Sequence, residues 1–385
     1  MQFQSMNPDE IALLESRSKI NQDSNGQTFY ERTKEYDSAE RVIALEKMLN
    51  LLVQSNEVIY SVKSNPVLRK KFVHATGAGK ELLRYISNTL PQIEQHLTGH
   101  TFTPTVAAFI KHVNTLDLDV QWNVLNSLSN LETDTAVDKL NSFVQALRSE
   151  LQTDELRFEE KKFKRNAKDN CNVLMKYFRD WFKYRAKVLA LRFDLGYGAS
   201  AHQVINGCQG KPYAKMAEKM QAHRDLFFKH VRKHFKGEKV GYAWKLEYGL
   251  FKGFHCHVIL LLNGDKHWSD VNLTKQLGEY WKTVITEDQG LYFNCNAQKH
   301  VYKYPSVGLL YACDEGKWKG LECIARYLTK PDGYIKLELP GNSRVFGKGN
   351  MPKLKHVKLG RPRIKQTAQA FMQLRSIRPR HCAYV

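Results

Sequence analysis

The segment GFHCHVILLLNG, residues Gly253 to Gly264, holds two histidines at the head of a strongly apolar run. The run, Val258 to Leu262, lies between glycine-containing turns, and its short length favours a buried strand over a helix. Side chains alternate along a strand, so His255 and His257 share one face. Two imidazoles on one face can reach the same ion, which predicts a metal site if another ligand lies nearby.

The preceding segment supplies that third ligand. VGYAWKLEY, residues 240–248, has the alternation of a strand, and a short connection joins it to the histidine strand, which predicts an antiparallel hairpin. Glu247 lies eight residues before His255, so the two should be opposite each other on one face. We therefore expect Glu247, His255 and His257 to bind one divalent ion. The ligand set suits Mn²⁺, Zn²⁺ or another first-row ion, and Mg²⁺ where substrate phosphate adds oxygens.

The segments around the hairpin indicate the fold class. KVLALRFDL, residues 187–195, reads as a central strand, and residues 213–235 as a basic amphipathic helix. Helices alternating with hairpin strands predict an α+β fold with a central antiparallel sheet flanked by helices.

The N-terminal part shows a different pattern. Residues 37–160 repeat apolar positions at helical spacing, with Ser38 and Thr135 placed as helix caps, and predict an additional α-helical domain. The expected division is an α-helical accessory domain at 1–165, a catalytic domain at 166–352 and a basic C-terminal extension at 353–385.

Charge is distributed unevenly along the chain. The 385 residues include 59 Lys and Arg against 39 Asp and Glu, a net charge of +20. Residues 1–160 hold 16 basic and 22 acidic side chains (−6), which leaves 43 basic and 17 acidic (+26) for 161–385. An excess of this kind favours binding to nucleic acid, since cations that neutralise phosphates release counterions.

The chain has no apolar run near the ~20 residues that span a bilayer, and no signal peptide at its start. We expect a cytoplasmic protein that makes no membrane contact. Seven cysteines without a C-x-x-C pair indicate reduced thiols rather than a zinc ribbon or disulfide framework.

A second motif, CIARYLTKPDG, spans Cys323 to Gly333. If residues 317–330 are helical, Tyr327 and Lys330 share a face turned away from the apolar stripe. A phenol with a pKa of ~10 is a poor nucleophile at neutral pH, but a nearby cation or base helps its deprotonation. With a metal ion to polarise a phosphate, this pattern predicts attack on DNA by Tyr327, assisted by Lys330. The products would be a 5′-phosphotyrosine and a free 3′-hydroxyl.

These residues resemble the motifs of a known superfamily. FHCHVILLLN resembles the His-hydrophobe-His motif of the HUH endonucleases, and YLTK their Y-x-x-K nucleophile motif, while VLALRFDL stands where their first motif lies. SRVFGKGNMP, Ser343 to Pro352, resembles the replication initiators of filamentous phages and their integrated relatives. The resemblance covers residues 170–352. It implies an HUH-like fold, a bound metal ion (Mg²⁺ or Mn²⁺) and a tyrosine that nicks single-stranded DNA to start rolling-circle replication in a bacterial host cell.

Several alternatives remain open. Some initiators have two tyrosines one helical turn apart, but here Cys323 takes that position, so the chain resembles a one-tyrosine enzyme. Tyr302, Tyr304 and Tyr311 lie close in sequence and are candidates either for rival nucleophiles or for rings that stack with DNA. A mobilisation relaxase or single-tyrosine transposase would share the chemistry, although relaxases commonly place the tyrosine before the histidines. A catalytically inactive DNA-binding regulator and a metal-dependent hydrolase of small phosphoesters are further readings.

The expected partners are single-stranded DNA at a replication origin, including hairpin DNA, and host replication proteins, which the acidic N-terminal part is suited to bind. Residues expected to contact DNA are basic and lie near the motifs or in the C-terminal extension: Arg192, Arg326, Lys303, Arg344, Lys348, Arg361 and Arg363.

Overall fold

The computed structural model describes residues 6–22, 28–198, 211–249, 252–302 and 304–351. The chain divides into two compact units. The helical unit comprises residues 32–166 and 333–336, and the sheet unit comprises the rest. The sheet unit takes up the chain again at residue 167, and the first 31 residues group with it as well. They do so because helix α1 (Pro8–Ser16) packs on helix α12 (Glu315–Thr329) of the sheet unit.

The helical unit contains strands as well as the expected helices. Its helices are α2 (Lys34–Gln54), α3 (Gly77–Arg84), α4 (Leu90–His96), α5 (Pro104–Thr115), α6 (Trp122–Ser127), α7 (Asn130–Leu151) and the first part of α8 (Asp154–Tyr184). Strands β3 (Tyr60–Asn65) and β4 (Lys70–Ala75) form an antiparallel hairpin, and β5 is His100–Phe102.

Two helices of this unit begin earlier than predicted. The N-cap of α2 is Thr33, and that of α7 is Ser129, which forms a capping box with Glu132. Ser38 and Thr135 are therefore inside helices, and the predicted caps are wrong. Ser38 is fully buried, and its hydroxyl bonds His96 Nδ1 instead.

The sheet unit is built on a six-stranded antiparallel sheet, which agrees with the predicted α+β class. The strand order is β10-β6-β8-β7-β12, with β9 also paired to β6. The strands are β6 (Lys187–Tyr197), β7 (Gly241–Gly249), β8 (Gly253–Asn263), β9 (Gly290–Asn294), β10 (Gly308–Tyr311) and β12 (Phe346–Lys348). Strand β8 is central and every one of its residues is buried, which explains its nearly continuous apolar sequence.

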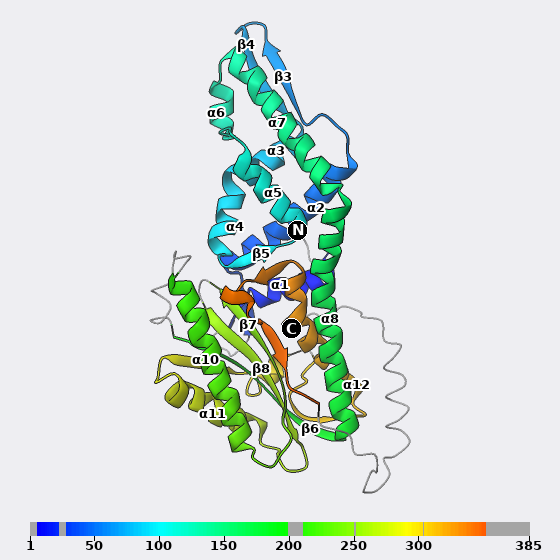
Figure 1. Ribbon diagram of the computed structural model, residues 1–385, viewed down its shortest axis with the longest axis vertical. Helices are drawn as coiled ribbons and strands as arrows, with labels where there is room; N and C mark the ends of the chain where they lie inside the picture. Colours follow the sequence, from blue (N-terminus) through cyan, green and yellow to red (C-terminus); the bar gives the residue numbers. More distant parts are fainter. Residues whose placement is uncertain (1–5, 23–27, 199–210, 250–251, 303, 352–385) are drawn as a thin grey trace. The chain divides into compact units, whose positions relative to one another are not determined.

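Helices cover both faces of this sheet (Figure 1). On one face, α10 (Lys211–His234) and α11 (Asp270–Tyr280) pack with Phe254, Cys256 and Val258 of β8. On the other face, the second part of α8 and α12 pack with Ile259 and Leu261. His255 and His257 have the parity of Ile259, so they lie on the α8 and α12 face, at the end of the sheet where β8 begins.

The remaining elements are short: β1 (Lys19–Gln22), β2 (Thr28–Glu31), β11 (Ile335–Leu337), the π-helical turns η2 (Tyr85–Thr89) and η3 (Trp281–Ile285), and the 3₁₀ turns η4 (Lys299–Val301), η5 (Lys330–Gly333) and η6 (Pro340–Asn342). Among the helices described, none is both long and apolar enough to cross a membrane.

Candidate metal centre

The β7-β8 hairpin sets the geometry of the candidate site. Its register pairs Glu247 with His255 and Lys245 with His257, so the predicted hairpin and the predicted opposition of Glu247 and His255 are confirmed. Gly253 opens β8 with a φ of 58°, a left-handed conformation that glycine adopts without strain. The two histidines follow directly after this turn.

The three predicted ligands lie together. One ligand atom from each of Glu247, His255 and His257 lies within 4.8 Å of the others. Glu247 Oε2 is 3.5 Å from His255 Nε2 and 3.3 Å from His257 Nε2. All three residues are buried. We call this group the triad.

Neighbouring acceptors orient both imidazoles. His255 Nδ1 lies 3.1 Å from the Gly253 carbonyl, and because a carbonyl only accepts, this nitrogen carries the proton. His257 Nδ1 donates in the same way to Asp194 Oδ1 at 2.6 Å. In the neutral imidazoles both Nε2 atoms therefore present lone pairs toward Glu247. This is the usual outer support of metal-binding histidines.

The buried atoms at the centre of the triad show why an ion would fit there. When both imidazoles are neutral, Glu247 Oε2, His255 Nε2 and His257 Nε2 are all buried and have no hydrogen-bond partner among the described residues. A buried polar atom without a partner costs about 1–3 kcal/mol. One divalent cation would satisfy all three atoms at once, and two imidazoles with a carboxylate are a suitable donor set for a first-row divalent ion.

The carboxylates also change the protonation of the histidines. Burial alone would lower the pKa of His257, but the Asp194 and Glu247 carboxylates on either side raise it to about 9. Burial lowers the pKa of His255. Burial would raise the pKa of Glu247, yet the two imidazoles hold it well below its usual range. Without a metal ion, the triad therefore holds one extra proton at neutral pH, on His257.

The structure places Tyr327 next to this group. Its ring, on α12, contacts the His257 ring edge-on with centroids 5.2 Å apart. Burial and the Glu247 and Asp194 carboxylates raise the pKa of Tyr327 well above its usual value. Thus the predicted nucleophile and the predicted ligands, 70 residues or more apart in sequence, meet in space.

Arg192 lies beside the same tyrosine. Its guanidinium carbon is 5.0 Å from the Tyr327 ring and 5.7 Å from the Tyr302 ring. Arg192 is on β6, two residues from Asp194 and on the same face, and its side chain is buried. Of the basic residues expected to contact DNA, Arg192 is therefore the one placed at the triad by contacts in the structure.

The contacts of Lys330 and Arg326 differ from those of Arg192. Lys330 Nζ is 3.1 Å from Asp9 Oδ2, and Arg326 pairs with Asp9 at 2.8 Å and with Glu322 at 3.2 Å. Asp9 belongs to α1, so the lysine of the YLTK motif is engaged by the N-terminal helix. Its predicted assistance to Tyr327 stays a prediction.

The other predicted DNA contacts are dispersed. Arg344 is exposed, and Lys348 lies half-buried with Nζ 4.8 Å from the Tyr177 ring. Lys303, Arg361 and Arg363 lie outside the described residues, as does the extension at 353–385. Of the rival nucleophiles, Tyr311 is exposed at the end of β10, whereas Tyr302 lies at Arg192.

Sequence reasoning missed Asp194 and Lys245. The signal for Asp194 in the sequence is a charged residue within an apolar strand, two positions after Arg192 and therefore on the same face. Lys245 lies opposite His257, and its buried Nζ pairs with both Asp332 carboxylate oxygens at 2.5 Å. Asp332 directly follows the tyrosine helix in turn η5, so this ion pair fixes the end of that helix to the sheet.

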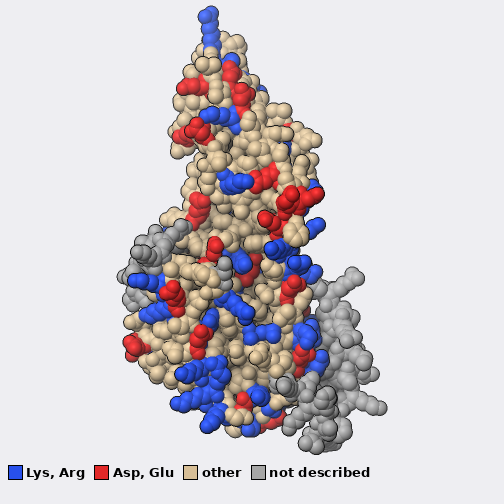
Figure 2. All heavy atoms as spheres, in the orientation of Figure 1, with Lys and Arg blue, Asp and Glu red and all other residues tan. Residues whose placement is uncertain are grey.

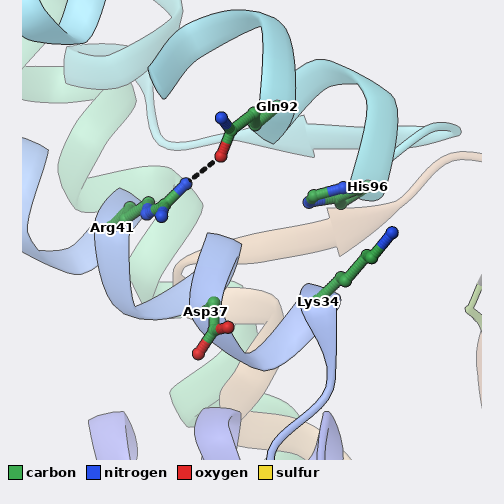
Figure 3. Close-up of a pocket in the computed structure, with 5 residues that line it drawn as sticks. All are labelled: Lys34, Asp37, Arg41, Gln92 and His96. Atoms are coloured by element: carbon green, nitrogen blue, oxygen red, sulfur yellow. Dashed lines mark hydrogen bonds between the residues drawn. The ribbon is translucent and has the colours of Figure 1, made fainter. Parts of the chain in front are cut away.

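A hollow of about 380 Å³ lies elsewhere, in the helical unit (Figure 3). Lys34, Asp37, Arg41, Gln92 and His96 line it, and Arg41 donates a hydrogen bond to Gln92. Burial and the neighbouring Lys34 lower the pKa of His96. These side chains include a single acid and a single imidazole, which is a poorer metal-binding set than the triad. We therefore place the candidate site at the triad.

Comparison with known families adds one match. Residues 152–303 match the family model of the YagK/YfjJ C-terminal domain. This is a family of prophage-associated proteins. The matched segment includes Asp194 and the whole triad and ends before the helix of Tyr327. No curated protein and no solved structure matches the chain significantly.

Proposed function

We propose that this protein is a metal-dependent enzyme of the HUH type that nicks and rejoins single-stranded DNA through Tyr327. The observation that carries the proposal is the ring contact between Tyr327 and His257, which brings a phenol to three converging ligand atoms. The HUH-like fold is part of the proposal and is supported by the order of motifs along the chain.

Each residue has a distinct task in this proposal. Glu247, His255 and His257 would hold a divalent ion, Mg²⁺ or Mn²⁺, which polarises the scissile phosphate when bound. Asp194 and the Gly253 carbonyl keep the imidazoles in the metal-binding tautomer. The Tyr327 oxygen attacks phosphorus and the bond to the 3′ oxygen breaks. The phenol proton passes to water and the 3′ oxygen takes one up, so protons and bonds balance.

The resemblance and the family match support a biological setting for this reaction. A 5′-phosphotyrosine conserves the energy of the broken bond for rejoining, which suits initiation of rolling-circle replication by a phage or phage-like element. The match to a family of prophage-associated proteins supports such an element. Mobilisation and transposition use the same chemistry and differ only in the DNA that is joined.

The test is covalent trapping. The full chain is incubated with Mn²⁺ and labelled single-stranded DNA that tiles the sequence flanking its own gene. We expect an adduct that survives SDS, requires the metal ion and is absent in Tyr327→Phe. Peptide mapping of the adduct then identifies the nucleophile.

Four substitutions separate the alternatives. If the adduct persists in Tyr327→Phe and disappears in Tyr302→Phe, Tyr304→Phe or Tyr311→Phe, the assignment of the nucleophile is wrong. Sequence-specific DNA binding without any adduct across the tiled DNA would instead support a regulator. Turnover of small phosphoesters that continues in Tyr327→Phe would support a hydrolase.

A further inference from the structure

A cluster of cations lies at the C-terminal end of α10 and just beyond it. We call it the cationic patch. Its five members are exposed and lie within eleven residues of the chain: Lys229, Arg232, Lys233, Lys236 and Lys239. Figure 2 shows Lys and Arg side chains gathered over the region where Figure 1 draws the lower half of α10.

The charges of the patch are uncompensated. Among the described residues, no member of the patch takes part in an ion pair. Glu238, the one acid between residues 229 and 239, is already engaged by Lys266 at 3.5 Å and by His267 at 3.1 Å. Like charges at helical spacing repel one another, so the free protein is slightly destabilised here. A polyanion laid across the patch would remove that repulsion.

The patch lies on the opposite side of the sheet from the triad. Helix α10 buries Phe227, Phe228 and Val231 against the face that carries Cys256 and Val258. The triad is on the other face, with Ile259 and α12. The sheet and one helix thus separate the patch from Tyr327, so phosphates bound at the patch belong to another stretch of nucleic acid than the one that is cut.

The side chains of the patch indicate which nucleic acid it fits. Binding of single strands relies on aromatic side chains that stack with unpaired bases. Between residues 227 and 239, Phe227, Phe228 and Phe235 are buried in the core and unable to stack with a base, whereas Trp268, which follows the His267 that contacts Phe235, is exposed. Five exposed lysines and arginines beside a single exposed indole ring suit the regular phosphate backbone of a duplex better than a run of stacked bases.

We propose that the cationic patch binds the backbone of duplex DNA, independently of base sequence, while the triad face takes the single strand. The assignment to DNA rests on the proposed function, but binding at the patch needs neither a metal ion nor Tyr327. Duplex binding at the patch and nicking at Tyr327 can therefore be tested, and disproved, independently of each other. Duplex binding is measured without nicking, and nicking is measured on oligonucleotides too short to reach both faces.

The test compares two full-length variants of equal charge. In the patch variant, Lys229, Arg232, Lys233 and Lys236 become Glu. In the matched control, four exposed lysines of the helical unit become Glu: Lys63, Lys80, Lys161 and Lys162. In both, four positive charges become four negative ones, a change of −8. Fluorescence anisotropy with a random-sequence duplex gives Kd at several salt concentrations, and circular dichroism confirms folding.

Wild type and control should bind duplex with the same steep salt dependence. The patch variant should bind at least about tenfold more weakly at low salt. Its slope of log K against log[salt] should be less negative by about 3 to 4, since each lost phosphate contact removes about 0.9. An unchanged slope would overturn the proposal. So would absence of duplex binding in the wild type, or an equal loss of affinity for a poly-dT single strand.

Discussion

Asp194 accepts a hydrogen bond from His257 Nδ1 at 2.6 Å, from the neighbouring strand of the sheet. The bond holds the imidazole with Nε2 turned to Glu247 and makes that nitrogen more basic. A carboxylate behind a metal-binding histidine is typically worth a factor of 10–100 in metal affinity. Asp194 is thus part of the candidate centre, although it contributes no atom to the triad.

Replacement of Asp194 should weaken metal binding. We expect Asp194→Ala to reduce Mn²⁺ affinity about 10- to 100-fold in calorimetric titrations, because the ring of His257 loses its anchor. Asp194→Asn keeps an acceptor oxygen and should lose less. Asp225→Ala, an exposed site on α10, is the control and should bind as wild type does. Equal affinity in Asp194→Ala and wild type would show that the hydrogen bond has no part in metal binding.

Metal loading should release a proton. The pKa of His257 is raised to about 9, so its imidazole is protonated at pH 7, and a cation at Nε2 must displace that proton. We expect release of close to one proton per Mn²⁺, read from calorimetry in buffers of different ionisation enthalpy. Apparent affinity should rise about tenfold per pH unit from pH 7 and level off near pH 9. Binding without proton release would mean that the ion lies elsewhere.

Arg192 should matter for the reaction and much less for metal binding. Its guanidinium lies against the Tyr327 ring, where it can contact the phosphate under attack. We expect Arg192→Gln to slow adduct formation on the order of 100-fold, the scale seen when a donor to transition-state charge is removed. Arg192→Lys should recover part of the rate.

Arg224 provides a matched control for this substitution. Its guanidinium also lies over an aromatic ring, 4.0 Å from Trp244, but on the α10 face of the sheet. Arg224→Gln makes the same chemical change away from the triad and should form adduct at the wild-type rate. If both variants lose activity equally, the effect of Arg192→Gln reflects folding rather than chemistry.

The buried pair of Lys245 and Asp332 should behave as a unit. Lys245→Met leaves the Asp332 charge buried without its partner, which typically costs about 3–5 kcal/mol in the free energy of unfolding. The double substitution Lys245→Met with Asp332→Leu should recover most of that stability. Denaturant titrations of the wild type, Lys245→Met, Asp332→Leu and the double variant give the coupling energy. Additive effects, with no recovery in the double variant, would contradict a direct interaction.

The sequence predicts the local geometry of this site well. The period of two along a strand and the short connection between two strands are enough to place Glu247 opposite His255. The helical period also predicts that Tyr327 lies away from the apolar stripe of its helix, but in the structure Tyr327 is partly buried and packs against the core that contains this stripe. Its contact with His257, by contrast, depends on how the helix packs on the sheet, which periodicity does not specify.

Contacts between residues far apart in the chain could not be predicted from the sequence, for a physical reason. The bonds from Lys330 and Arg326 to Asp9 join residues more than 300 positions apart, and nothing in a charge pattern identifies such partners. The same holds for Lys245, which reads as an ordinary polar residue on an alternating strand. Its burial depends on the packing of α12 and turn η5 against β7, where Asp332 pairs with it.

The carboxylate of Asp9 has a practical consequence for anyone who wishes to trim this protein. A chain started at residue 152, where the family match begins, would retain Tyr327 and the histidines but lose α1. Lys330 would then lose its ion pair with Asp9. Arg326 would also lose its pair with Asp9 and keep only the one with Glu322. A truncated version should therefore include helix α1, fused to the chain or co-expressed as a separate peptide, rather than begin at residue 152.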